Sequence, residues 1–81
     1  MKLSSEYIAN ECSALLNRVY GKQISKVKKY DYMEEICVVI DKEIYKDDMK
    51  LWNIILSLKF NYLWKNGAYD ILFVDDIRGG E

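Results

Sequence analysis

Apolar residues recur at intervals of three and four along the first quarter of the chain. These positions are Ile8, Cys12, Leu15, Leu16 and Val19. Such spacing places them on one side of an α-helix, and it predicts a helix from about Ser5 to Tyr20. Ser4 or Ser5 can cap its N-terminus, and Gly21 follows its last residue, where a left-handed C-cap is common.

Two short apolar segments follow, and both have the composition of β-strands. The first, from about Gln23 to Tyr32, contains three lysines, which are typical of an edge strand because they discourage pairing with other chains. The second, Ile36–Ile40, is apolar at every position, which predicts a central strand covered on both faces. A turn at about Met33–Glu34 would join the two strands as a hairpin.

The pattern from Asp47 to Gly67 predicts a second long helix that begins at Asp47 or Asp48, continues to about Asn66 and ends at Gly67. Its apolar residues cover well over half of the circumference at about 100° per residue. A helix that lies on a small sheet needs an apolar stripe of only about 100°, so this helix has apolar surface to spare. The last segment, residues 70–77, contains an apolar run and predicts a third strand.

These elements predict one α+β domain over residues 1–81, in the order αββαβ, with a flexible tail at about residues 78–81. A strand–helix–strand connection makes the third strand parallel to the second, so we expect a three-stranded mixed sheet packed by two helices. The pattern leaves two strand orders open, 1-2-3 and 2-1-3. A chain of 81 residues builds only a small core, and self-association would stabilise it.

Composition narrows the chemistry that the chain can perform. It has no histidine, two cysteines and a net charge of −1. Histidine-dependent triads and dyads, histidine-liganded zinc sites and four-cysteine metal sites are therefore excluded. We expect Cys12 and Cys37 to be buried side chains, because Cys12 lies on the apolar stripe of the first helix and Cys37 lies inside the apolar second strand. The N-terminal residues lack an apolar signal segment, and we expect a cytoplasmic protein that does not span a membrane.

Acidic residues follow two of the predicted strands. Asp41 comes directly after Ile36–Ile40, and Asp75 and Asp76 come after Ile71–Val74. The carboxyl ends of parallel strands share one edge of a sheet, and clustered carboxylates are ligands for Mg²⁺. One interpretation is therefore a magnesium-dependent phosphoryl-transfer or nuclease fragment that uses these three residues. The other is that the three carboxylates are solvated, since no general base or phosphate-binding glycine loop accompanies them.

Positive charge is concentrated in the first part of the chain. Residues 1–30 carry six Lys and Arg and two Asp and Glu, whereas residues 31–81 carry six and eleven. A nucleic-acid-binding module is the alternative function, with nearby tyrosines available to stack on bases. Its candidate residues are Arg18, Lys22, Lys26, Lys28 and Lys29. The sequence pI of 5.4 argues against it, because dedicated nucleic-acid-binding domains typically have values above about 9.

Large aromatic residues gather in the second predicted helix and directly after it. They are Trp52, Phe60, Tyr62, Trp64 and Tyr69. Tyrosine and tryptophan are enriched at protein interfaces, and a large apolar surface on a small chain usually marks a partner site. The alternative is that these residues complete the core.

The function that the sequence favours is a non-enzymatic protein-binding module without a cofactor. Its aromatic residues would contact a protein partner or a second copy in a homodimer. The small size and the composition rich in lysine, isoleucine and tyrosine also suggest an inhibitor or regulator encoded by a phage or mobile element. Such a protein would act by steric block of a macromolecular partner.

Overall fold

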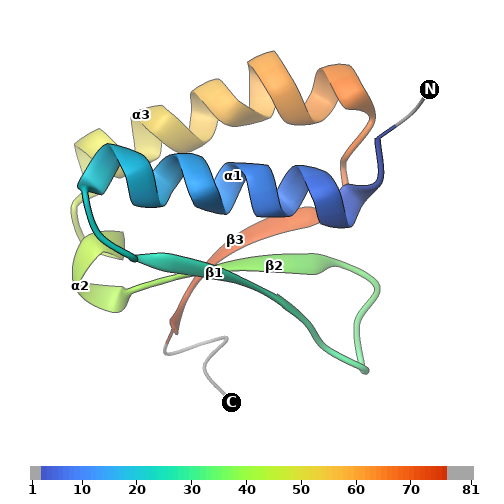
Figure 1. Cartoon of the computed structure of the whole chain (residues 1–81), viewed down its shortest axis with the longest axis horizontal. Coiled ribbons are helices and arrows are strands. Elements are labelled where there is room, and N and C mark those ends of the chain that lie inside the picture. The colour runs from blue at the N-terminus through green and yellow to red at the C-terminus, as the bar shows by residue number, and fades with distance from the viewer. Residues whose placement is uncertain (1–2, 77–81) are drawn as a thin grey trace.

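The chain folds in the order α–β–β–α–α–β, which is the α+β class that the sequence predicts (Figure 1). The computed structural model describes residues 3–76, and the predicted flexible tail at residues 78–81 lies outside that range. The elements are α1 (Ser5–Tyr20), β1 (Ser25–Lys29), β2 (Ile36–Ile40), α2 (Lys42–Tyr45), α3 (Asp48–Leu58), the π-helical turn η1 (Lys59–Leu63), the 3₁₀ turn η2 (Trp64–Asn66) and β3 (Ile71–Asp75). None of the helices within residues 3–76 has the length and apolar character that a membrane crossing needs.

Helix α1 has the bounds that the sequence predicts. The side chain of Ser4 accepts a hydrogen bond from the Tyr7 N–H at 3.1 Å, and Gly21 closes the helix with a φ of 70°. A left-handed φ is unfavourable for residues with a Cβ, so glycine suits this position. The buried side of α1 includes Ile8, Cys12 and Leu16, as their spacing predicts.

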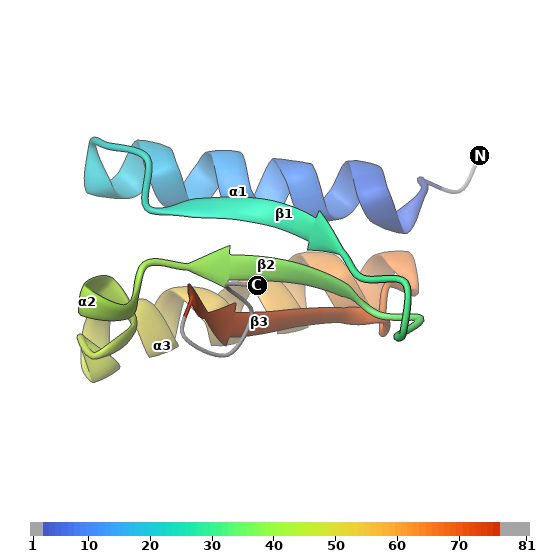
Figure 2. The same ribbon diagram turned by 90° about the horizontal axis from the view of Figure 1, so that it is seen from below.

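The sheet has the order β1-β2-β3, which selects the first of the two predicted arrangements (Figure 2). β1 and β2 are antiparallel, with Ser25 opposite Ile40, and β2 and β3 are parallel, with Ile36 opposite Ile71. The mixed sheet is therefore confirmed. β1 is shorter than predicted, because the chain turns after Lys29, where the Met33 N–H donates to the Tyr30 carbonyl at 3.3 Å.

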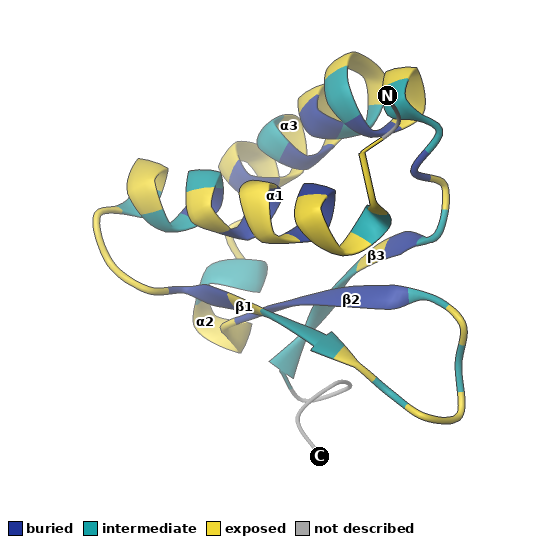
Figure 3. Ribbon diagram, turned by 45° about the vertical axis from the view of Figure 1, so that its right-hand side comes forward, coloured by how far each residue is buried: buried dark blue, intermediate teal, exposed yellow. Residues whose placement is uncertain are grey.

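Strand β2 is the central strand and is buried at all five positions (Figure 3). The prediction of a central strand covered on both faces is confirmed, although both helices, α1 and α3, lie on the same side of the sheet (Figure 1). Val38 and Ile40 belong to the core beneath the helices, whereas the alternation of a strand directs Cys37 and Val39 to the other face. Neighbouring strands flank Cys37 there, with Lys28 opposite on β1 and Leu72 on β3.

The short helix α2 is absent from the predicted order αββαβ, and the structure corrects that order. Only four residues form it, which is too few for a periodic apolar pattern. Asp41 precedes it, and its carboxylate accepts a hydrogen bond from the Glu43 N–H at 2.8 Å. A capping aspartate directly after a strand therefore starts a helical turn at this point.

The second long helical segment ends at Gly67, as predicted, but it is not regular throughout. α3 continues to Leu58, and the π-helical turn η1 and the 3₁₀ turn η2 follow before Gly67 adopts a φ of 70°. Asp47 occupies the N-cap position, although its side chain makes no capping hydrogen bond. The buried residues are spaced by four and three up to Leu58 and then by five to Leu63. The π turn therefore returns Leu63 to the core.

Candidate protein-interaction site

Four large apolar side chains form a row along the outside of α3, η1 and η2. They are Trp52, Leu56, Phe60 and Trp64, spaced four residues apart, and we call them the aromatic ridge. Trp52, Phe60 and Trp64 are 51%, 56% and 43% exposed. Burial of such side chains is normally favourable, so their exposure on a chain with a small core requires an explanation.

The helical irregularity keeps this row straight. In a regular α-helix each step of four residues advances by about 40° around the axis, so three steps would spread the row over about 120°. The wider π turn between Lys59 and Leu63 reduces that advance. Phe60 and Trp64 consequently meet edge to face, with ring centroids 4.7 Å apart. The Lys59 Nζ lies 5.8 Å from the Trp52 ring centroid, so a positive charge borders the row.

The structure places the other two predicted interface residues differently. Tyr69 is 71% exposed, and its hydroxyl donates to the Trp64 carbonyl at 3.4 Å, so it extends the aromatic ridge at one end. Tyr62 is half-buried and packs against the core. Burial, followed by the proximity of Tyr7, Cys12 and Glu11, raises the pKa of Tyr62. Tyr62 therefore faces α1 rather than the ridge.

The flank of α3 that faces α1 differs from the ridge. A shallow cavity of about 310 Å³ lies between the two helices, lined by Leu15 and Val19 of α1 and by Ile54 and Leu58 of α3 among others. These residues are adjacent to the buried core, and Leu15 and Ile54 pack against it. The ridge therefore occupies a flank of the helical segment that does not face α1, and α3 itself lies on the β3 side of the sheet (Figure 2).

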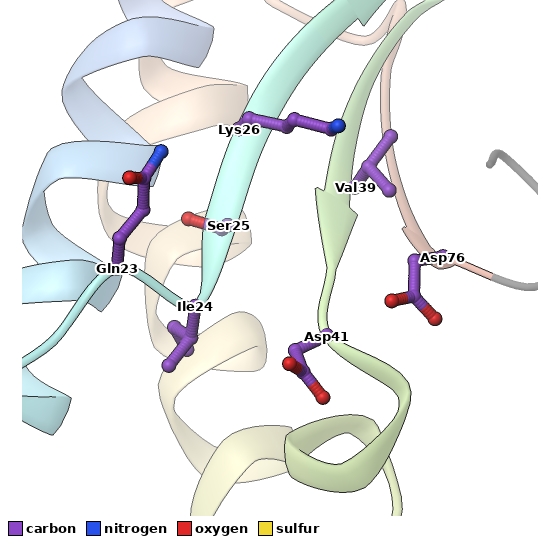
Figure 4. Close-up of a pocket in the computed structure, with 7 residues that line it drawn as sticks. All are labelled: Gln23, Ile24, Ser25, Lys26, Val39, Asp41 and Asp76. Carbon is purple, nitrogen blue, oxygen red and sulfur yellow. The ribbon is translucent and has the colours of Figure 1, made fainter.

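Two residues of the predicted acidic site have structural roles at the start of α2. Asp41 and Asp76 border a pocket of about 230 Å³ at the end of β2, and Lys26 extends along the same pocket (Figure 4). The Asp41 carboxylate caps α2 by accepting from Glu43, and the Asp76 carboxylate accepts from the Lys42 N–H at 3.1 Å. Both carboxylates thus hold the start of α2.

Asp75, the third predicted ligand, is the last residue of β3 and is half-buried. Within residues 3–76, no group of three or more histidine, cysteine, aspartate or glutamate side chains is placed to hold a metal ion. The three carboxylates lie at the ends of the neighbouring strands β2 and β3, and Asp41 and Asp76 bind backbone N–H groups there.

The five basic candidate residues come from three consecutive parts of the chain: the end of α1, the loop after it and β1. Arg18 lies on the last turn of α1 and Lys22 follows it in the loop, whereas Lys26 and Lys28 lie on β1. The Lys29 Nζ donates to the Met33 carbonyl at 2.5 Å. Strand alternation directs Lys26 and Lys28 to the helix-free face.

Both cysteines are buried free thiols, in accord with the sequence prediction. Burial, followed by the nearby Glu11, raises the pKa of Cys12 to about 11. Burial also raises the pKa of Cys37, with a further contribution from Glu35 that Lys29 partly offsets. A raised pKa leaves little thiolate at neutral pH, so neither thiol is set up as a nucleophile.

One member of the ridge, Leu56, is missing from the predicted interface set. Its signal was present in the sequence, because Leu56 stands midway between Trp52 and Phe60 at the same four-residue spacing. The sequence could not assign Leu56 to the ridge for two reasons. The helix is apolar on most sides, so the pattern does not show which side an aliphatic residue faces, and the pattern does not reveal the π turn. Comparisons of the chain with protein-family models, with curated proteins and with solved structures found no match.

Proposed function

We propose that this domain functions by binding protein through the aromatic ridge, without catalysis of its own. The observation that carries the proposal is the row of Trp52, Leu56, Phe60 and Trp64, whose side chains are partly exposed on one flank of α3. With Tyr69, the exposed parts of the aromatic members come to roughly 330–550 Å², taking about 150–250 Å² for each full side chain. Patches of this size on small monomers are often functional.

A role of the ridge in the core of the chain itself is not supported. The buried side of the same helical segment is supplied by Leu51, Ile55, Leu58 and Leu63. These residues complete the layer between α3 and the sheet. The ridge lies outside that layer, where tryptophan and phenylalanine are typical of residues that contribute most of the binding energy in protein interfaces.

The polar features of the domain support a binding function rather than a catalytic one. Asp41 and Asp76 are engaged in capping hydrogen bonds at α2. The thiols of Cys12 and Cys37 are buried, and the pKa of each is raised. Nucleophilic chemistry by cysteine needs an accessible thiolate, and both thiols are buried with a raised pKa. A binding domain of this kind can act as an inhibitor or regulator by covering part of its partner.

The two tryptophans give a direct test, because the chain has only two and both lie on the ridge. We would immobilise three forms of the chain and compare the protein that each retains from solution, including free copies of the chain itself. The ridge variant carries Trp52→Ser and Phe60→Ser. The control carries Tyr7→Ser and Val19→Ser, which removes two comparably exposed apolar residues from α1.

The proposal predicts that wild type and control retain the same protein and that the ridge variant loses it. Contact at the ridge should also shift tryptophan emission to shorter wavelength and reduce its quenching by acrylamide. Equal retention by all three folded forms, with unchanged tryptophan emission, would overturn the proposal. Circular dichroism of each variant separates loss of binding from loss of folding.

A further inference from the structure

The outer edge of β3 offers backbone hydrogen-bonding groups beside the ridge. The Ile36 N–H of β2 donates to the Asp70 carbonyl at 2.9 Å. Because backbone groups alternate along a strand, the N–H and C=O groups of Ile71 and Phe73 then point away from β2. No other strand within residues 3–76 pairs with that side of β3. An apolar edge without lysine, proline or a bulge is a ready template for another strand.

The edge of β3 and the aromatic ridge face the same side of the molecule. In Figure 2 the order across the sheet is β1, β2 and β3, with α1 along the β1 side and α3 along the β3 side. The cavity between α1 and α3 fixes the inner flank of α3, so the ridge is on the outer flank, above the β3 edge. Strand edge and ridge thus form one surface, which we call the β3 side.

We infer that the β3 side binds a second copy of this chain about a two-fold axis. β3 pairs antiparallel with β3 of the second copy, with Phe73 at the centre of the strand on the axis, and the two sheets become one. The two ridges then pack against each other above the joined strands. This inference rests on the proposed function, since it names the partner of the same ridge.

Charge along the ridge favours a second copy in this orientation. Asp48 lies at the N-terminal end of α3, in line with the ridge, and Lys65 lies at the C-terminal end next to Trp64. A two-fold axis across the middle of the ridge sets the helices antiparallel, so Asp48 of each copy comes near Lys65 of the other.

The area of the β3 side is also close to what a dimer needs. A standard interface buries about 800 Å² on each partner. The aromatic residues of the β3 side supply roughly 330–550 Å² of this at about 150–250 Å² per full side chain. Leu56, Leu72, the exposed part of Met49 and the outer backbone of β3 add to it. Joining the sheets also removes an unprotected edge, which no heteromeric contact with the ridge alone would do.

The first measurement is the solution mass by sedimentation equilibrium over a range of concentrations. We expect a species of twice the 9.6 kDa of one chain that dissociates on dilution. Leu72→Lys places a lysine on the β3 edge, at a side chain that is 38% exposed on the helix-free face, and should give a folded monomer. Val19→Lys makes the same kind of change at an exposed apolar residue of α1 and should remain a dimer.

A charge exchange tests the orientation. Asp48→Lys alone and Lys65→Glu alone should each weaken the dimer by between about twofold and thirtyfold, because each removes two exposed ion pairs per dimer. The double variant with both changes should recover most of that loss. Recovery of dimer affinity in the double variant would show that the loss in Asp48→Lys comes from the ion pair. Any effect of Asp48→Lys on the stability of α3 is present in the double variant too, so it could not give that recovery.

A chain that is monomeric at all concentrations would overturn the dimer while leaving the ridge free for a different protein, which the retention experiment detects independently. A dimer that Leu72→Lys, the Trp52→Ser and Phe60→Ser pair and the charge exchange all leave unchanged would place the contact elsewhere and overturn the inference. Failure of the ridge variant to lose any retained protein, its own copies included, would overturn the proposed function as well.

Discussion

The β1 side and the β3 side of this small sheet each consist of an edge strand with a long helix beside it, but the residues on their outer surfaces differ. On the β1 side, α1 lies along an edge strand that carries Lys26, Lys28 and Lys29. The exposed positions in the first half of α1 are mostly polar, namely Glu6, Asn10 and Glu11. Its exposed large apolar residues, Tyr7 and Val19, stand apart from each other near its two ends. On the β3 side, α3 lies along an edge strand with the apolar sequence Ile71–Val74, and the outer positions of α3 carry the ridge.

Folding alone does not require this difference. Both helices bury one apolar side, and Leu16 of α1 and Ile55 of α3 are each completely buried. A polar outer surface on α3 would leave that packing intact. Lysines on an edge strand are a common means of preventing association, and β1 has them whereas β3 lacks them. The difference therefore points to association at one side of the sheet and protection at the other.

The two helices are also fixed to the sheet by different interactions. α1 is joined to β1 by polar side chains, because the hydroxyl groups of Ser13 and Ser25 lie 2.7 Å apart and Asn17 bonds to the same strand. α3 rests on the sheet through aliphatic residues. Substitutions on the β1 side should therefore lower stability by leaving hydrogen-bonding groups without a partner. Substitutions on the β3 side should lower stability by removing buried apolar volume.

The largest effect on stability should come from the inner side of α3. Ile55→Ala removes a completely buried side chain and should lower the free energy of unfolding by about 2–5 kcal/mol, through lost burial and the cavity left behind. Met49→Ala changes a side chain of similar size on the same helix that is 75% exposed, and should cost less than about 1 kcal/mol.

Urea denaturation of both variants, followed by circular dichroism, gives this comparison. Concentrations at which the chain is monomeric should be used, because association adds to the apparent stability. An equal loss of unfolding free energy in the two variants would contradict the structure, in which Ile55 is buried and Met49 is exposed.

The next largest effect should come from the polar contact on the β1 side. Asn17 Oδ1 accepts from the N–H groups of Ile24 and Ser25 at 2.7 and 2.9 Å. Asn17→Ala leaves those donors without this partner in a partly buried place, and should lower the free energy of unfolding by about 1–3 kcal/mol. Asn10→Ala is the matched control, because the Asn10 amide donates to the exposed Glu6 carbonyl of its own helix and not to the sheet. A loss in the control as large as that in Asn17→Ala would contradict this account.

Sequence reasoning succeeded where one dominant pattern decided the structure. The three- and four-residue spacing and Gly21 predicted α1 with its observed bounds. The uniformly apolar run Ile36–Ile40 predicted the central strand, and Gly67 predicted the end of the second long helical segment. In each case the local signal and the tertiary packing require the same conformation.

The remaining features depend on tertiary contacts that no local pattern carries. α2 is a four-residue turn held by side chains from Asp41 and from the distant Asp76. The π turn changes which residues of an all-round apolar helix face outward, so the sequence could list the aromatic residues without separating Tyr62 from Phe60 and Trp64. The prediction of an interface at Trp52, Phe60, Trp64 and Tyr69 remains to be tested.

A smaller effect should appear in the response to alkaline pH. The pKa of Cys12 is about 11 in the folded chain against an ordinary value of 9.0, because burial disfavours the thiolate. The folded state therefore keeps a proton that the unfolded state loses, and the resulting stability is full below about pH 9 and lost as the pH rises toward 11. Cys12→Ala should have a flatter stability profile over that range than wild type.

Alkylation provides a second measurement of the same property. At pH 8 both cysteines should react slowly with iodoacetamide in the folded chain and rapidly in urea, as followed by mass spectrometry. Rapid labelling of Cys12 under native conditions would show that this thiol is accessible and would remove the basis of the predicted pH profile.

The smallest effect should come from reversing charge on the protected β1 side. Lys26→Glu with Lys28→Glu should change the free energy of unfolding by no more than about 1 kcal/mol, because both residues lie on the helix-free face and the contact of the Lys28 Nζ with the Tyr30 ring, 5.4 Å from its centroid, contributes about 0.5–1 kcal/mol. The same variant tests the alternative of a nucleic-acid surface. Two lysines on β1 can contact about two phosphates, which predicts a slope of only about −1.4 for log affinity against log salt with single-stranded RNA. The opposite outcome is a slope steeper than about −3 for wild type that is lost in the double variant. That result would show that Arg18, Lys22 and the lysines of β1 bind nucleic acid together, so that β1 is a binding surface rather than a protected edge.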